Sequence, residues 1–180
     1  KEIRDSGVIT DPTLARQLDK LYYAYLTNQV PPDLLKELVD LDAKVQEKYN
    51  TFRGDIDGKK VTMRDIYTIM TAEKDVRTRQ LAWRASRQGG DVIVADLIQL
   101  VKLRNQAARK VGFGNYHTMM IVTGEQNIEE LDNIFHQLDK LTAKPFAEMK
   151  KELDSILAKS YGITPKDLMP WHYHDPFFQR

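Results

Sequence analysis

The chain has 180 residues, 42% of them hydrophobic and 29% charged, and its formal net charge is +1. This length allows one domain with a sizeable core, the balance is that of an ordinary globular protein, and no apolar run approaches the ~18 residues that a membrane-spanning helix needs. The sequence contains no cysteine, which excludes disulfides, thiol catalysis and thiolate metal sites, and the near-zero charge gives no overall field that would attract nucleic acid.

Two helices are predicted in the first fifty residues. Asp11 is typical of a helix cap and Pro12 of a first helical position, and apolar residues follow them at spacings of three and four. A second amphipathic pattern runs from Pro31 to Tyr49. The short connection between the two patterns predicts that the helices are antiparallel neighbours.

Residues 52–61 interrupt the helical pattern and are predicted to form a short irregular or hairpin insertion. The pair Asp57-Gly58 is typical of a type I′ hairpin turn. The same segment resembles a calcium loop only superficially. Its acidic residues are followed directly by Lys59 and Lys60, and the bidentate glutamate that an EF-hand requires at its twelfth position is not part of the pattern.

The middle of the chain predicts three more helices. Thr62 and Asp65 approximate a capping box for a helix through Met70. The next helix begins near Asp75 and is expected to stop at Gly89-Gly90, and the third runs from there to Gly112.

Two residues of these helices are predicted to have structural roles. Trp83 is large and apolar, and we expect it to be a core anchor. Asn105 lies on one helical line with Val94, Ile98, Val101 and Ala108. An amide on a hydrophobic stripe is expected to be buried and to form hydrogen bonds across helices.

A short helix or turn is expected at 116–122, followed by a long helical pattern at 128–160. Pro145 lies inside this pattern and is expected to kink the helix or to divide it into two. No internal repeat or linker is evident. We therefore predict an all-α, multi-helix array that forms one helical subdomain over residues 1–180.

Several isolated signals have simple structural interpretations. His117 and His136 are expected to be surface or hydrogen-bonded residues, because neither has a second ligand four residues away. Gly112 and Gly114 indicate helix termination rather than a phosphate loop. No set of residues suggests a nucleophile with its base, so no catalytic residue is predicted. Nine basic residues are expected to form a solvated face rather than a nucleic-acid site: Lys74, Arg77, Arg79, Arg84, Arg87, Lys102, Arg104, Arg109 and Lys110.

The segment MPWHYHDPFFQR ends the sequence and is its most aromatic stretch. Four of its residues are predicted to contact substrate or to lie at an interface: Trp171, His172, Tyr173 and His174. His172, His174 and Asp175 could instead chelate a metal ion, which predicts stoichiometric zinc on the purified chain. A third convergent ligand is not evident, and the prolines and aromatic residues favour packing, so no metal site is predicted here.

Short helical signatures carry a resemblance to a known family. Ile69-Met70 is followed by Leu81-Ala82-Trp83-Arg84 and then by Val101, Asn105, Ala108 and Gly112-Phe113. This order and spacing resemble the N-terminal helical part of angiotensin-converting-enzyme-like zinc peptidyl-dipeptidases. The likeness extends over 31–170, which is most of the chain.

The resemblance implies helices around a deep channel, with zinc held by an H-E-x-x-H motif and a further glutamate. This sequence contains no His-Glu pair, so neither zinc ligands nor the general base can be assigned to any of its residues. Relatives have a Trp-Arg pair that contributes to chloride binding, whereas this chain has Met120-Ile121. Chloride activation through that site is therefore not expected.

The leading hypothesis is that this chain is the channel-wall or lid portion of a zinc peptidyl-dipeptidase and is inactive alone. Its partners would be the catalytic remainder of the polypeptide and a peptide substrate, and residues 161–180 would connect to that remainder. The initial Lys1 and the aromatic end support an excised piece. The rival is a non-enzymatic helical module that docks a partner protein through its C-terminal aromatic segment. No targeting segment is evident, and a periplasmic or secreted parent is compatible with the sequence.

Overall fold

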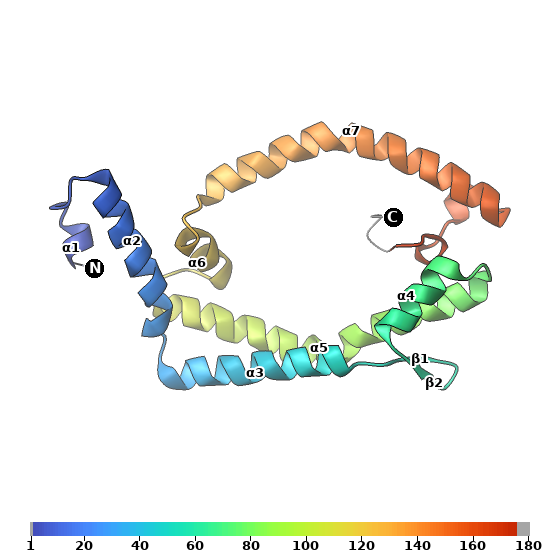
Figure 1. Cartoon of the computed structure of the whole chain (residues 1–180), viewed down its shortest axis with the longest axis horizontal. Helices are drawn as coiled ribbons and strands as arrows, with labels where there is room; N and C mark the ends of the chain where they lie inside the picture. The colour runs from blue at the N-terminus through green and yellow to red at the C-terminus, as the bar shows by residue number, and fades with distance from the viewer. Residues whose placement is uncertain (1, 176–180) are drawn as a thin grey trace. The chain divides into compact units, whose positions relative to one another are not determined.

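The computed structural model describes residues 2–175, and almost every element in this range is helical (Figure 1). This confirms the predicted all-α class. In chain order the elements are α1 (Glu2–Asp5), α2 (Pro12–Leu26), the 3-10 helix η1 (Thr27–Gln29), α3 (Pro32–Thr51), β1 (Gly54–Ile56), β2 (Lys59–Val61), α4 (Met63–Ala72), α5 (Val76–Lys110), α6 (Tyr116–Thr123), α7 (Ile128–Tyr161), η2 (Pro165–Asp167) and η3 (Pro170–His172). Within residues 2–175, no helix is long and apolar enough to cross a bilayer.

The chain divides into two compact units. One comprises residues 1–44 with 96–135, and the other comprises residues 45–95 with the chain from 136 onward. The helices α3, α5 and α7 each contribute residues to both units. The assignment of residues 1–180 to one subdomain, with 161–180 as a connection, stays a prediction.

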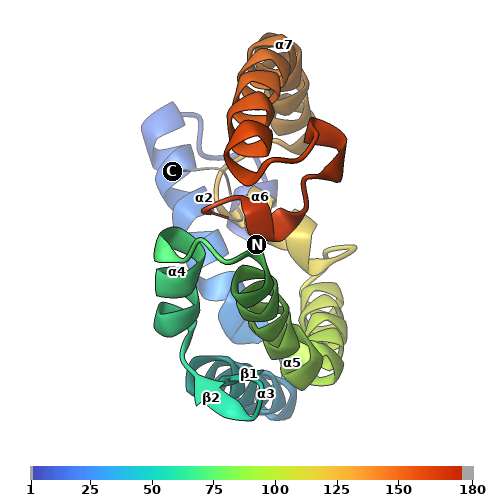
Figure 2. The same cartoon turned by 90° about the vertical axis from the view of Figure 1, so that its right-hand side faces the viewer.

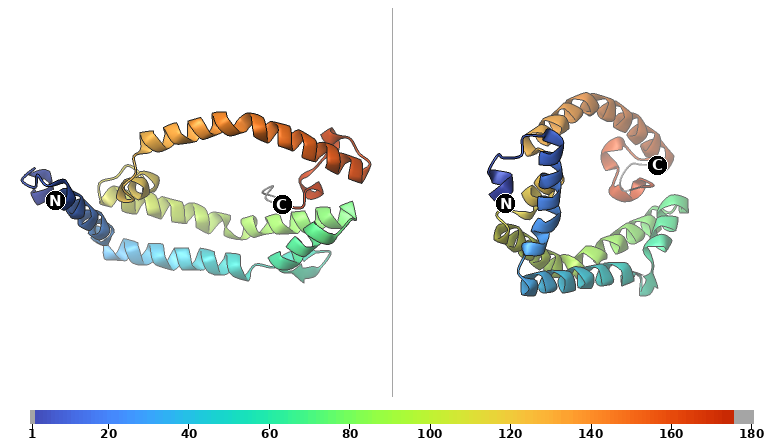
Figure 3. Two further views of the ribbon diagram at one scale, coloured as in Figure 1. Left: turned by 45° about the horizontal axis from the view of Figure 1, so that its top comes forward. Right: turned by 60° about the vertical axis from the view of Figure 1, so that its left-hand side comes forward.

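The first unit has a core between α3 and the second half of α5, which lie side by side (Figure 3). Its buried residues are Val30, Leu34, Leu103 and Ala107. Beside this core the Arg104 guanidinium donates to Asp42 at 2.6 Å. The expected antiparallel pairing of α2 with α3 is wrong, because α2 leaves α3 at a steep angle and α3 packs on α5 instead.

The second unit contains the predicted hairpin. Strands β1 and β2 pair antiparallel with Gly54 opposite Val61. Asp57 and Gly58 have φ angles of 51° and 83°, the positive values that a type I′ turn requires at both positions. Gly54 also lies so close to α5 that an added Cβ would be 3.1 Å from the Ala85 Cβ. The hairpin therefore depends on glycine both at its turn and where it meets the helix.

A small core joins this hairpin to α4 and the first half of α5 (Figure 2). Its buried residues are Val61, Ile66, Met70, Ala82 and Ala85, with Trp83 and Trp171 packed against them. The predicted capping box of α4 is confirmed. Thr62 Oγ1 accepts from the Asp65 amide at 3.1 Å, and the Asp65 carboxylate accepts from the Thr62 amide at 2.8 Å.

Two expected interruptions do not end a helix. The predicted stop at Gly89-Gly90 is wrong, because α5 continues from Val76 to Lys110. A Cβ on Gly89 would lie 3.3 Å from the Phe52 ring, so at this position glycine allows another segment to approach the helix closely. Helix α7 likewise continues through Pro145 as one helix. At Gly89 a tertiary contact thus outweighs the local breaking tendency. At Pro145 the predicted division into two helices is wrong.

One side of α7 exposes large apolar residues, which we call the α7 face. Its members within the second unit are Leu138, Leu141, Phe146, Met149 and Ile156. Leu141 is 72% exposed and Leu138 is 47% exposed. Apolar residues at helical spacing normally lie against a neighbour. In residues 2–175 this face lacks such cover.

Candidate functional site

The C-terminal segment after α7 is held by a buried arginine of α5. The Arg79 side chain is 0% exposed. Its Nε donates to the Trp171 carbonyl at 2.7 Å, and its Nη2 donates to the Tyr173 carbonyl at 3.0 Å. Its Nη1 donates to the carbonyls of Met70 and Glu73 at the end of α4. A single guanidinium therefore joins α4, α5 and the segment 171–173.

Arg79 corrects one prediction from the sequence, since it was counted among the residues of a solvated basic face. Burial lowers the pKa of Arg79 from its usual value, yet guanidinium groups stay protonated in proteins. The sequence does contain a signal for the burial of Arg79, because this residue lies three positions before the buried Ala82 and four before Trp83. That spacing places Arg79 on the same helical side as core residues.

The predicted contact residues Trp171 and His172 are turned toward the interior. The ring of Trp171 lies 5.7 Å from that of Trp83 in an edge-to-face arrangement. His172 is only 6% exposed, and its ring lies 4.9 Å from the ring of Tyr161. His172 Nδ1 accepts from the Met169 amide at 2.8 Å, and burial lowers the pKa of this imidazole. His172 thus acts here as a neutral structural acceptor.

Tyr173 belongs to a polar cluster with two residues of α7. The Lys150 ammonium donates to both Asp154 carboxylate oxygens at 2.7 Å and to the Tyr173 hydroxyl oxygen at 2.9 Å. The Tyr173 hydroxyl donates to Asp154 Oδ1 at 2.7 Å. Burial raises the pKa of Tyr173. Burial also acts to raise the pKa of Asp154, but the hydrogen bonds from Lys150 and Tyr173 outweigh it and leave that pKa lowered.

The residues of this segment do not fit a zinc ion. Nδ1 of His172 is already engaged, and His174 is exposed while Asp175 is buried. Throughout residues 2–175, no group of three or more metal-ligating side chains gathers in one place. Phe177 and Phe178, which belong to the same predicted packing segment, lie outside the described residues.

Two hollows surround Trp83 and Arg87 in this unit. The lysine hollow has a volume of about 400 Å³ and is lined by Trp83, Arg87, Lys150, Leu168, Met169, Pro170, Tyr173 and Asp175. The tyrosine hollow has a volume of about 230 Å³ and is lined by Tyr49, Met63, Ile66, Tyr67, Met70, Trp83, Ser86, Arg87 and His174. Tyr173 and His174 therefore line hollows, whereas Trp171 and His172 do not.

The two residues predicted to be structural are both half-buried. Trp83 packs against the core of its unit through its contact with Trp171. Asn105 lies in the other unit, where its side-chain oxygen accepts from the Tyr116 amide at 2.9 Å. This bond joins α5 to the first residue of α6. On α6, Met120 is exposed, at the position where the family resemblance places an aromatic and basic pair.

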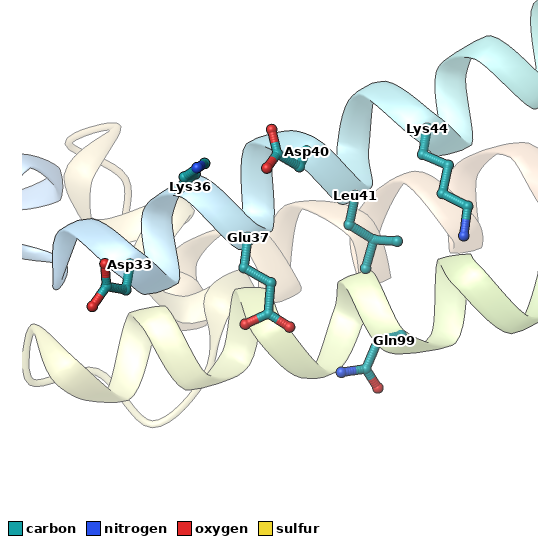
Figure 4. A pocket seen from close by; sticks show the side chains of 7 residues that line it. All are labelled: Asp33, Lys36, Glu37, Asp40, Leu41, Lys44 and Gln99. Carbon is teal, nitrogen blue, oxygen red and sulfur yellow. The ribbon is translucent and has the colours of Figure 1, made fainter.

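A further hollow of about 550 Å³ lies along α3 and α5 in the first unit. It is lined by Asp33, Lys36, Glu37, Asp40, Leu41, Lys44 and Gln99. Figure 4 shows that the acidic side chains are interspersed with lysines along α3 and do not converge on one point. Lys44 is already paired with Asp96 at 3.0 Å. This surface is a solvated charged face. His117 and His136 are also exposed, on α6 and α7.

The fold is all-α, and among residues 2–175 no group of three or more metal-ligating side chains gathers in one place. The model of the angiotensin-converting enzyme family of peptidases matches residues 3–174. The chain therefore belongs to the angiotensin-converting enzyme family, peptidase family M2. No curated protein and no solved structure matches the chain.

Proposed function

We propose that this chain is the N-terminal helical portion, a channel wall or lid, of a zinc-dependent peptidyl-dipeptidase that hydrolyses peptides. The catalytic remainder of the polypeptide would supply the zinc ligands and the general base. Family membership supports the peptidase assignment. The exposed α7 face is the single observation that supports an additional polypeptide partner.

The α7 face is one side of a well-formed amphipathic helix. The polar residues Lys144 and Lys151 lie on the other side of the helix and are exposed. Each fully buried large apolar side chain stabilises a fold by about 1.5–3 kcal/mol relative to exposure. The five residues of the α7 face are 47–72% exposed, so each lacks a substantial part of this stabilisation. A contiguous apolar face of this kind is typical of an interface with another polypeptide surface.

The chemistry of the chain agrees with a supporting role. The sequence contains no His-Glu pair, and the residues of the C-terminal segment do not fit zinc. The buried Arg79 instead fixes the backbone of the C-terminal segment at Trp171 and Tyr173. The contribution of this chain would be to shape and close the space that a peptide occupies.

The rival function, a binding module that docks through its C-terminal aromatic residues, is less well supported. Such an interface would need those rings at the surface. Trp171 is half-buried against Trp83, and His172 is almost fully buried against Tyr161. Within the described part of the segment, these two rings are therefore committed to internal packing.

The test is to express the chain alone and together with the polypeptide encoded downstream of it. Release of the C-terminal dipeptide from a blocked tripeptide is measured for each. We expect turnover only with the downstream polypeptide. Turnover by the isolated chain, or a reading frame without H-E-x-x-H downstream, would overturn the proposal.

A paired substitution links this activity to the α7 face. Leu138→Asp with Leu141→Asp places two charges in the proposed interface, and we expect at least a tenfold loss of activity in the assembled protein. Lys151→Asp on the polar side of the same helix is the control and should retain activity. Equal activity of both variants would show that the α7 face is not the interface.

A further inference from the structure

The tyrosine hollow has an apolar floor with polar groups around it. Ile66 and Met70 are almost fully buried members of the core and also line the hollow. They lie on one side of α4 with Met63 and Tyr67, at the spacing of successive helical turns. Because α4 begins with a complete capping box, this wall is fixed at its N-terminus.

The dimensions of the hollow suit an aromatic ring. Its volume is about 230 Å³, and an apolar cavity of roughly 150 Å³ is enough to hold benzene. Met63, Met70 and Trp83 are among its lining residues. Thioether sulfur and indole groups both make favourable contacts with aromatic rings.

Polar groups with unused bonding capacity border this apolar space. Among residues 2–175 no hydrogen bond is formed by the hydroxyls of Tyr49 and Tyr67, and no ion pair is formed by Arg87. The Arg87 guanidinium lies 5.2 Å from the centre of the Trp83 ring. Asp175 lines the lysine hollow and not this one. The tyrosine hollow is therefore bordered by donors, and by no carboxylate.

We propose that the tyrosine hollow is a binding site for an aromatic carboxylate. The ring would contact Met63, Tyr67 and Trp83, and the carboxylate would accept hydrogen bonds from Arg87, whose planar donors match carboxylate geometry. The C-terminal aromatic residue of a peptide and a free aromatic amino acid share this chemistry. The site goes beyond the proposed function, because it requires neither zinc nor catalysis.

The test follows the indole signals of Trp83 and Trp171 by NMR in the 180-residue chain. The probes are N-acetyl-phenylalanine, its uncharged amide, N-acetyl-alanine and free phenylalanine. We expect N-acetyl-phenylalanine to shift the Trp83 signal to saturation and N-acetyl-alanine to leave it unchanged. The amide should bind about threefold to fivefold more weakly, since an exposed ion pair contributes little more than that.

Two arginine variants test whether the charge of Arg87 binds the carboxylate. Arg87→Gln should make the acid and the amide bind equally, whereas Arg84→Gln, an exposed neighbour on α5 that lines neither hollow, should preserve the difference. If Arg87→Gln does not fold, Tyr67→Ala serves instead and should weaken acid and amide alike. Free phenylalanine binding as tightly as the blocked form would assign the site to amino acids, and weaker binding would assign it to peptide ends.

Three results would overturn the proposal. The first is a Trp83 signal that does not respond to N-acetyl-phenylalanine. The second is equal affinity of the acid and the amide in the unmodified chain. The third is the same loss of discrimination in Arg84→Gln as in Arg87→Gln. None of these results depends on peptidase activity, so the site can fail while the proposed function stands.

Discussion

Two regions of the second unit, around Arg79 and along the α7 face, differ in how far their side chains contact other parts of the chain. Around Arg79 the hydrogen bonds are internal, because the guanidinium donates to four backbone carbonyls contributed by two separate segments. Along the α7 face, large apolar side chains from Leu138 to Ile156 are exposed. The Arg79 region holds the segment after α7, and the α7 face is available for another surface.

The contrast separates residues that stabilise this chain from residues of the proposed interface. Removing a buried donor leaves acceptors without partners, which costs more than the hydrogen bonds themselves contributed. Replacing an exposed apolar side chain removes almost no internal contact. Stability measurements on matched variants can therefore test the comparison directly.

The largest effect is expected for Arg79→Ala. Four carbonyls lose their donor in a buried setting, so the free energy of unfolding should fall by about 3–5 kcal/mol. Urea denaturation followed by circular dichroism measures this change. The exposed Arg84→Ala is the control and should lie within about 0.5 kcal/mol of the unmodified chain. A similar small effect at Arg79 would contradict its role as the central contact of this region.

A smaller effect is expected for Tyr173→Phe. The change removes the hydroxyl that donates to Asp154 and accepts from Lys150, while the ring is kept. Because the direct Lys150–Asp154 pair remains, we expect a loss of about 1–2 kcal/mol. Thermal unfolding provides the measurement. Tyr67→Phe removes a hydroxyl without a hydrogen bond in the described residues and should leave the melting temperature unchanged.

Because His172 is buried, we expect the free energy of unfolding to depend on pH. Burial lowers its pKa in the folded chain below the value of about 6.5 that an exposed histidine has. Its contribution to stability is therefore complete above that unfolded value and is lost as the pH falls through the folded one. Urea denaturation from pH 7.5 to 5 should show this decline. His172→Asn, whose side-chain oxygen can still accept from Met169, should flatten this part of the profile, and the exposed His117→Asn should leave it intact.

The smallest effect is expected on the α7 face. Leu138→Gln should change the free energy of unfolding of the isolated chain by less than about 0.5 kcal/mol, because the side chain is already in water. Ala158→Leu, at a buried position near the C-terminal end of the same helix, should cost about 1–3 kcal/mol through overpacking. Chemical denaturation of both variants tests this. A large loss for Leu138→Gln would show that the face is packed within this chain.

Much of the helical pattern was predictable because the signals are local. The Thr62–Asp65 capping box and the Asp57-Gly58 turn each depend on residues no more than three positions apart. Such bonds form within a single turn of chain, so the residue types suffice to predict them. The stop at Gly89-Gly90 failed because Phe52, more than thirty residues away, packs against that glycine.

The candidate site was predictable only in part. The sequence indicated that residues 171–174 matter, but not which of them face inward. Tyr173 and His174 line hollows, whereas Trp171 and His172 are oriented by packing against Trp83 and Tyr161. The tyrosine hollow was missed altogether, because its lining comes from four separate stretches of the chain.

The sequence by itself determined the class of the fold, the helix caps, the hairpin turn and the resemblance to the peptidase family, because each depends on the identity and spacing of nearby residues. The tertiary structure decided that Arg79 is buried, that His172 is a neutral acceptor, and that one side of α7 is left exposed. Arg79 shows the reason: its bonds to Trp171 and Tyr173 join residues more than ninety positions apart, and only the folded chain brings them together.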